Sequence, residues 1–241
     1  DLVLGKGWVR VGYLKGVSRR AGGEAEVVYV SDGIDLRDFD ERDPDPDDEH
    51  GGEEHGDEHG EDHDHGSYDP HVWFDPNNVL TWTHNIEETL VRLDPDNAAD
   101  YRSNARDYRV ELQELDSWIR EQVSRVPEEN REMVTDHTVF GYFTDQYGFE
   151  QIGAVIAAPT TGREPSGQQI ARLIETIQEY DVKAIFVGKD FDPALSRRVA
   201  EDTGAQLVSL YFGSLSEASG PAATYLEFMR YNVRAIVEAL Q

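Results

Sequence analysis

The sequence predicts an α/β protein of two lobes, in which each lobe is a parallel sheet flanked by helices and one long spine helix joins them. Three observations support this fold class: short apolar segments near the amino terminus, an amphipathic pattern of about 30 residues in the middle, and alternating strand-like and helix-like segments thereafter. The predicted divisions are an amino-terminal lobe at 1–93, a linking helix at 94–126 and a carboxy-terminal lobe at 127–241.

The amino-terminal lobe is expected to contain two strands and a helix. Apolar residues 2–4 form the first strand and residues 26–30 the second, and each run ends at a glycine-containing turn. Because the sequence opens directly on a strand, with no leader pattern before it, we expect it to begin inside a fold, with any export signal either removed or never part of this sequence. Asp75-Pro76 has the pattern of a helix start and predicts a helix through 79–93.

The linking helix is predicted from a regular apolar face that begins after Asp94-Pro95. Apolar or aromatic side chains recur at steps of three and four residues, which keeps them on one side of a helix. They are Tyr101, Ala105, Tyr108, Leu112, Leu115, Ile119 and Val123. At 1.5 Å per residue such a helix spans about 45 Å, which is long enough to connect two lobes.

The carboxy-terminal lobe shows the alternation that is typical of a parallel sheet. The predicted strands are 132–135, 151–157, 184–187 and 206–210. The predicted helices are 138–147, 166–180, 193–203 and 222–240. Open α/β sheets bind ligands beyond the carboxyl ends of their strands, so the residues that follow each strand are the candidates for function.

Composition excludes several classes of protein. The 241 residues include 49 acidic and 22 basic side chains, a formal net charge of −27, so nucleic acid and anionic lipid are not expected partners. Only four basic residues are lysine, and an acidic, lysine-poor surface is typical of a halophilic source, with an ordinary acidic protein as the alternative. Cysteine is absent, which excludes disulfides and thiolate metal sites. No apolar run approaches the roughly 18 residues needed to cross a bilayer.

Residues 38–66 form an acidic, histidine-rich segment that we expect to be a disordered loop. The segment consists almost wholly of Asp, Glu, His, Gly and Pro, which cannot bury enough apolar surface to order it. Imidazoles and carboxylates suit zinc and related divalent ions, so metal binding is expected, although weakly because nothing preorganises the ligands. The alternative is a solvated charged run with incidental histidines. The candidate ligands are His50, His55, His59, His63 and His65.

Two further histidines are candidate ligands in ordered surroundings. His71 lies in a rigid, partly aromatic segment, where a carboxylate can orient one ring nitrogen and leave the other for a metal. His137 follows strand 132–135, at the end of the strand where such sheets bind ligands. Each could singly be a structural histidine, but together they predict a cleft site for Zn²⁺, with Mn²⁺ as the alternative. His84, inside a helix, is interpreted as structural.

Several segments of the chain share their residues, order and spacing with a known family. They are Asp1-Leu-Val-Leu, the acidic histidine segment, Asp69-Pro-His-Val-Trp-Phe-Asp-Pro76, His137-Thr-Val-Phe-Gly-Tyr-Phe143 with Tyr147-Gly-Phe149, Glu164-Pro-Ser166, Ala184-Ile-Phe-Val187, and Gly220-Pro221 leading to Tyr225-Leu226 and Asn232. In these residues the chain resembles the zinc- and manganese-binding solute receptors of ABC importers, over nearly its whole length. The resemblance implies a two-lobed fold joined by one long helix, with His71 and His137 as metal ligands.

The chain also departs from that family. Members normally begin with a further segment that carries a histidine ligand, so the chain resembles an amino-terminally truncated member. After the strand at 184–187 the family usually has a glutamate, where this chain has Gly188. An aspartate ligand of the family corresponds to Gly213, although Asp190 and Glu217 lie nearby in the sequence. The resemblance therefore implies that only part of the family's cleft ligand set is present.

The favoured hypothesis is an extracytoplasmic receptor, not an enzyme, that binds zinc or manganese and delivers it to the membrane permease of an ABC importer. It would be periplasmic or at the cell surface, exported by a signal or held by a lipid anchor. The alternative is a degenerate or truncated paralogue that acts as a low-affinity metal buffer or as an adhesion or interaction protein. We expect a monomer, unless the sheet edge of a truncated lobe drives association.

A metallohydrolase that uses His71, His137 and Asp136 is a third hypothesis, of a different class. It is disfavoured because the sequence has no His-Glu-x-x-His motif, no glycine-rich phosphate loop and no Gly-x-Ser-x-Gly elbow.

Overall fold

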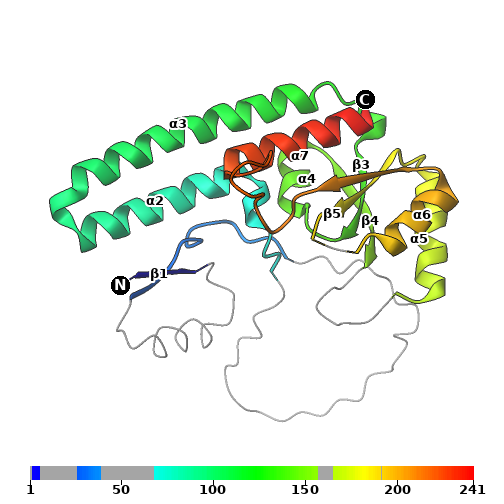
Figure 1. Ribbon diagram of the computed structural model, residues 1–241, viewed down its shortest axis with the longest axis horizontal. Coiled ribbons are helices and arrows are strands. Elements are labelled where there is room, and N and C mark those ends of the chain that lie inside the picture. The colour runs from blue at the N-terminus through cyan, green and yellow to red at the C-terminus, as the bar shows by residue number, and fades with distance from the viewer. Residues whose placement is uncertain (1, 6–25, 39–67, 157–164, 191) are drawn as a thin grey trace, which may run out of the picture.

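The structure is a computed structural model, and its elements follow the order expected from the sequence (Figure 1). It describes residues 2–5, 26–38, 68–156, 165–190 and 192–241. The predicted disordered loop lies outside the described residues except at its first position, and so do the five candidate ligands His50, His55, His59, His63 and His65. Their assignment as ligands stays a prediction.

Two short strands near the amino terminus form a parallel sheet. Strand β1 spans Leu2–Gly5 and strand β2 spans Glu26–Tyr29, and they pair in register along their whole length. The two strands expected in this part of the chain are therefore confirmed, and they pair in parallel.

A 3₁₀ turn and a long helix follow. The turn η1 spans Val72–Phe74, and helix α2 spans Pro76–Leu93. The Asp75 side chain accepts a hydrogen bond from the Asn77 backbone N–H at 2.9 Å, and this satisfies an amide that has no partner within the helix. The Asp-Pro helix start is confirmed, although the helix begins three residues before the predicted position.

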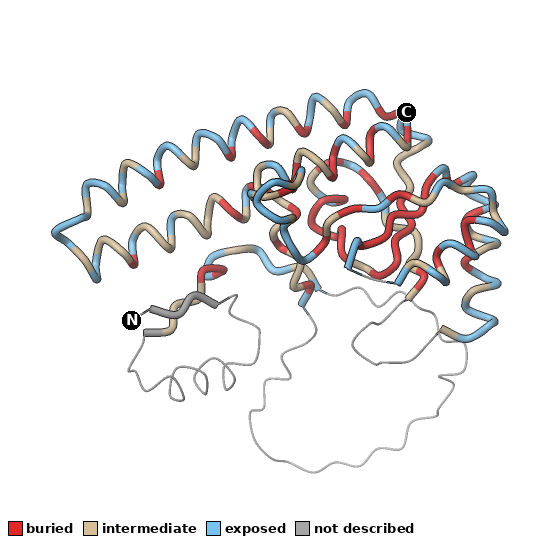
Figure 2. Tube along the Cα trace, in the orientation of Figure 1, coloured by how far each residue is buried: buried red, intermediate tan, exposed pale blue. Residues whose placement is uncertain are grey.

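Helix α3, Ala98–Val123, is the long helix that the apolar periodicity predicts, and the 3₁₀ turn η2, Pro95–Asn97, precedes it. It runs beside α2 and then alongside the last helix of the chain (Figure 1). Most of the α2–α3 pair far from the sheet is exposed or only partly buried (Figure 2). The buried side chains of α3 all belong to the predicted face: Ala105, Leu112, Leu115, Ile119 and Val123. The division into two lobes at 94 and 126 stays a prediction.

The rest of the chain forms a four-stranded parallel sheet with helices between its strands. The sheet order is β4-β3-β5-β6, and every pairing in it is parallel. The strands are β3 (Glu132–His137), β4 (Glu150–Ile156), β5 (Ala184–Gly188) and β6 (Gln206–Leu210). The helices are η3 (Glu128–Asn130), α4 (Gly141–Tyr147), α5 (Gly167–Glu179), α6 (Ala194–Thr203) and α7 (Tyr225–Leu240). The predicted parallel sheet flanked by helices is confirmed here. None of the described helices combines the length and apolar character needed to cross a membrane.

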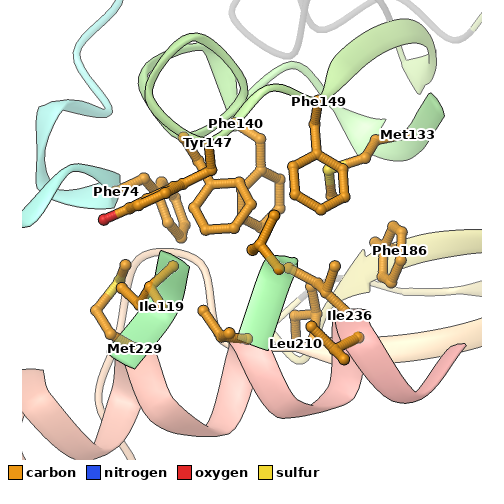
Figure 3. Close-up of a cluster of buried hydrophobic side chains, with 14 of the residues drawn as sticks. Phe74, Ile119, Met133, Phe140, Tyr147, Phe149, Phe186, Leu210, Met229 and Ile236 are labelled. Atoms are coloured by element: carbon orange, nitrogen blue, oxygen red, sulfur yellow. The ribbon is translucent and has the colours of Figure 1, made fainter. Parts of the chain in front are cut away.

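The two faces of this sheet pack against different helices. Along β5, Phe186 belongs to one buried cluster and Ile185 to another, as expected where side chains alternate between faces. The first cluster joins the sheet to α3, α4 and α7 (Figure 3), and the second lies under α5 and α6. Phe74 of η1 belongs to the first cluster, so the turn that follows His71 is part of the main core.

Candidate metal centre

His71 lies at the start of η1, and the residues of this turn anchor it. The buried Phe74 ring has its centroid 4.4 Å from that of Phe140. Trp73 Nε1 donates to the Phe212 carbonyl oxygen at 3.0 Å, and the Tyr225 hydroxyl donates to the Trp73 carbonyl oxygen at 2.9 Å. Because packing and two hydrogen bonds fix the turn, the backbone at His71 is held against the carboxy-terminal part of the chain.

A buried carboxylate orients the His71 ring. Asp69 is fully buried, and its Oδ1 accepts the His71 backbone N–H at 2.9 Å and lies 2.7 Å from His71 Nδ1. The expectation that a carboxylate orients one nitrogen of this ring is confirmed. In the neutral tautomer that donates Nδ1–H to Asp69, the lone pair lies on Nε2, the atom available to a metal.

His137, the last residue of β3, is oriented in the same way by the residue before it. Asp136 Oδ1 lies 2.6 Å from His137 Nδ1, and Asp136 Oδ2 accepts the Gly188 backbone N–H at 2.7 Å. Both side chains are buried. Since Gly188 ends the neighbouring strand β5, two strands together position this aspartate. The tautomer that donates Nδ1–H to Asp136 again places the lone pair on Nε2.

The fold brings the two imidazoles together. The ring centroids of His71 and His137 are 6.1 Å apart, and the ring planes make an angle of 67°. Zinc binds an imidazole nitrogen at about 2.0–2.1 Å, so rings at this separation are close enough to share one ion. Aromatic rings line both sides, with Trp73 5.4 Å from His71 and Phe212 5.6 Å from His137, centroid to centroid.

The histidine pair is not joined by a third ligand within the part of the chain that the structure describes. No group of three or more histidine, aspartate or glutamate side chains in that part could hold a metal ion. Gly213 follows Phe212, which packs against His137, and a Cβ built on Gly213 meets no heavy atom within 4 Å. The position that corresponds to the family's aspartate therefore has room for a side chain.

Two other residues named from the sequence, Asp190 and His84, contact partners outside this pair. Asp190 accepts a hydrogen bond from the Ser214 hydroxyl, on the same loop as Gly213. His84 is exposed on α2, with its Nε2 3.5 Å from Glu88 Oε1, which agrees with a structural interpretation.

Sequence reasoning missed the residues that surround Asp69. Tyr142 donates its hydroxyl to the Asp69 carbonyl oxygen at 3.2 Å, and the Arg37 backbone N–H donates to the same Tyr142 hydroxyl at 3.0 Å. Arg37 and Tyr142 are 105 positions apart, so no local pattern could have joined them.

Comparisons with known proteins identify the family of this chain. The family model described as "Zinc-uptake complex component A periplasmic" matches residues 9–239. The manganese-binding lipoprotein MntA of Halalkalibacterium halodurans is 34% identical over 173 residues, covering 71% of this chain and 57% of that protein. The high-affinity zinc uptake system protein ZnuA of Bacillus subtilis is 32% identical over 174 residues, covering 71% and 53%. The chain thus spans a little over half the length of these curated relatives.

Solved structures share the fold. The periplasmic zinc-binding protein TroA of Treponema pallidum superimposes with a TM-score of 0.76 at 25% identity, covering 100% of this chain and 80% of that one. A Mn-bound periplasmic metal-binding protein of Candidatus Liberibacter asiaticus gives a TM-score of 0.75 at 25% identity, covering 100% and 81%. The resemblance drawn from the sequence is confirmed, and the chain belongs to the family of periplasmic zinc-uptake components, which are solute-binding proteins and not enzymes.

Proposed function

We propose that the chain is an extracytoplasmic receptor that binds Zn²⁺ through His71 and His137 and delivers it to the permease of an ABC importer. The observation that carries the proposal is the pair of imidazoles, 6.1 Å apart, each held at Nδ1 by a buried aspartate. Such aspartates orient the ring and increase the basicity of the nitrogen that binds the metal. The relatives described as zinc- or manganese-binding proteins support the same class of cargo.

Zinc is the better fit of the two candidate metals. Imidazole nitrogen suits zinc, whereas manganese favours carboxylate and water oxygens, and Mn²⁺ lies at the weak end of the affinity order for a given site. With two histidines as the described ligands, Zn²⁺ is expected to bind more tightly than Mn²⁺. Protons compete with the metal for imidazole, so affinity falls as the pH is lowered from about 7.5 to about 5.5.

The histidine-rich segment is proposed to collect metal near this site. The described residues on either side of it pair with each other close to His71, because the Asp69 backbone N–H donates to the Arg37 carbonyl oxygen at 2.9 Å and Asp38 forms a bridge with Tyr68. Weak ligands tethered at that point raise the local concentration of the ion. The proposed collecting residues are His50, His55, His59, His63 and His65.

Calorimetric titration of Zn²⁺ and Mn²⁺ into the full chain tests the proposal. Three variants are compared with it: His71→Ala with His137→Ala, a variant with all five segment histidines changed to Asn, and His84→Ala as the control. We expect one tight Zn²⁺ site that only the double variant abolishes, whereas the segment variant removes only weaker binding. A tight site that survives in the double variant would place the ligands elsewhere.

A low-affinity metal buffer is the second candidate function. The room at Gly213 and the absence of a third described ligand favour it. It predicts that all measurable Zn²⁺ binding disappears with the five segment histidines and that the double variant binds like the unaltered chain. The same titrations therefore separate the two candidates.

A further inference from the structure

One oxygen of the Asp69 carboxylate is buried without a hydrogen bond in the described part of the molecule. Oδ1 is occupied by the His71 ring and backbone, but Oδ2 has no hydrogen-bond partner there. A buried carboxylate is strongly destabilised unless an opposite charge lies close to it. The aspartate that orients His71 therefore depends on a nearby cation.

The Arg37 guanidinium lies near Asp69 Oδ2, beside Gly141, although no hydrogen bond or ion pair joins the two groups. A Cβ built on Gly141 would lie 2.6 Å from Asp69 Oδ2 and 2.9 Å from Arg37 Cζ, and closer still to Arg37 Nη1. The guanidinium and the carboxylate thus both border the space that a side chain at position 141 would occupy. Arg37 Nε also donates to Asp145 Oδ2 at 2.7 Å, which fixes the guanidinium to α4.

The backbone at Arg37 holds the same aspartate from the other side. The Arg37 carbonyl oxygen accepts the Asp69 backbone N–H at 2.9 Å, and the Arg37 backbone N–H donates to the Tyr142 hydroxyl at 3.0 Å. That hydroxyl in turn donates to the Asp69 carbonyl oxygen at 3.2 Å. Arg37, Tyr142 and Asp69 therefore form a closed set of hydrogen bonds that fixes the Arg37 backbone beside Asp69, while the bond to Asp145 fixes the guanidinium.

We infer that Arg37 is a positioning residue for the metal site: its guanidinium, seated against Gly141, holds the Asp69 carboxylate in the geometry that orients His71. The inference rests on the proposed function, because it concerns the same site. A plain surface ion pair is the competing interpretation, since the Asp145 side chain is 63% exposed and such pairs contribute little. The two interpretations differ because Asp69, unlike Asp145, is fully buried and contacts a candidate ligand.

The test compares two variants with matched controls in the full chain. Arg37→Gln removes the charge, and its control is Arg106→Gln, at an exposed arginine on α3 that pairs with Asp107 at 3.1 Å. Gly141→Ala fills the space with Arg37 intact, and its control is Gly167→Ala, where a Cβ meets no heavy atom within 4 Å. Zn²⁺ affinity, the visible absorption of the Co²⁺ complex and the Nδ1–H proton resonance of metal-free His71 are measured for each.

We expect Arg37→Gln and Gly141→Ala to weaken Zn²⁺ binding about 10-fold, the lower end of the range for residues behind a ligand. Both variants should alter the Co²⁺ absorption and the His71 resonance, whereas the controls match the unaltered chain and Arg37→Lys recovers part of the loss. If Gly141→Ala fails to fold, Arg37→Gln still decides the matter. Unchanged affinity and an unchanged resonance in Arg37→Gln would overturn the inference.

The two proposals fail in different ways. If the unaltered chain binds no Zn²⁺ tightly, the proposed function is wrong, but the His71 resonance of the metal-free protein still tests whether Arg37 positions the Asp69–His71 pair. If the unaltered chain binds Zn²⁺ and Arg37→Gln binds it equally well with the same resonance, only the role of Arg37 is wrong.

Discussion

Asp69 and Asp136 hold the two histidines by different means. Asp69 uses one oxygen for both the ring and the backbone of His71, so it holds the segment that leads into η1. Asp136 divides its two oxygens between the His137 ring and the Gly188 amide. Asp136 therefore supports the histidine and also ties β3 to β5.

Changing Asp136 to Asn is expected to damage both stability and binding. The amide NH₂ must face either the Gly188 N–H or the ring N–H of His137, so one buried donor loses its acceptor, at a cost of about 1–3 kcal/mol. Urea unfolding should show this loss, and calorimetry should show Zn²⁺ affinity reduced about 10–100-fold. Asp107→Asn, at an exposed position on α3, is the control. Equal stability of Asp136→Asn and the unaltered chain would contradict the expectation.

Gly213→Asp is expected to strengthen metal binding. The position has room for a side chain, it follows a residue that packs against His137, and a carboxylate adds a ligand that suits either candidate metal. We expect Zn²⁺ affinity to rise at least about 10-fold, equal to about 1.4 kcal/mol. Gly213→Ala, which adds the Cβ without a ligand, is the matched control in competition titrations. An aspartate that binds no more tightly than alanine would show that this loop does not reach the ion.

Among the elements, β3 and α4 differ from their predicted bounds in the segment that follows His137. The predicted strand ends at 135 and the predicted helix begins at 138, but β3 continues to His137 and α4 begins only at Gly141. The Thr135 hydroxyl donates to the His137 carbonyl oxygen at 2.7 Å, and Gln151 Nε2 donates to that hydroxyl at 2.6 Å. These side-chain hydrogen bonds hold the strand end that carries the histidine.

The start of α2 gives a prediction about pH. Burial raises the pKa of the Asp75 carboxyl above its ordinary value of 3.8, and Asp116 adds to this, although the Asn77 hydrogen bonds oppose it. Because the folded state binds this proton more tightly than the unfolded state, Asp75 contributes less stability as the pH rises through its folded pKa. Asparagine also caps helices but carries no charge to desolvate.

Asp75→Asn should therefore be at least as stable as the unaltered chain at pH 7.5, and its relative advantage should shrink as the pH is lowered towards 5. Urea unfolding of both proteins at several pH values measures the difference. Asp75→Ala, which loses the cap, should be less stable than Asp75→Asn by about 1 kcal/mol at every pH, because neither side chain titrates. An advantage of Asp75→Asn that grows on acidification would contradict the assigned direction of the pKa shift.

At the scale of the whole molecule, charge is the dominant feature. A net charge of −27 on 241 residues opposes the compact state through repulsion among carboxylates. Salt shortens the range of that repulsion from about 10 Å at 0.1 M to about 3 Å at 1 M. The stability of this chain is therefore expected to depend on ionic strength.

Thermal melts from low salt to 1 M KCl should show a rising midpoint. The gain should be similar in NaCl and KCl, because screening depends on ionic strength and not on the identity of the cation. A melt in the same buffer without added salt serves as the reference. A midpoint that is flat or falls with KCl would count against charge repulsion, and with it against the halophilic character expected from the composition.

The sequence by itself determined the α/β class, the long helix and the two candidate histidines. These predictions follow from short-range patterns. The apolar face of residues 98–123 and the alternation of strand-like and helix-like segments after residue 127 indicate which side of each element is buried. The Asp-Pro start of α2 and the Ser166 cap of α5 are equally local, since both depend on residues within three positions.

Only the tertiary structure decided what surrounds those histidines. The 6.1 Å separation of His71 and His137, the Gly188 amide on Asp136 and the placement of Arg37 against Gly141 join residues that are 50 to more than 100 positions apart. No short-range pattern encodes such contacts, because they depend on the order of strands in the sheet and on where η1 packs. The sequence thus indicated the candidate histidines, and the fold determined which residues orient them.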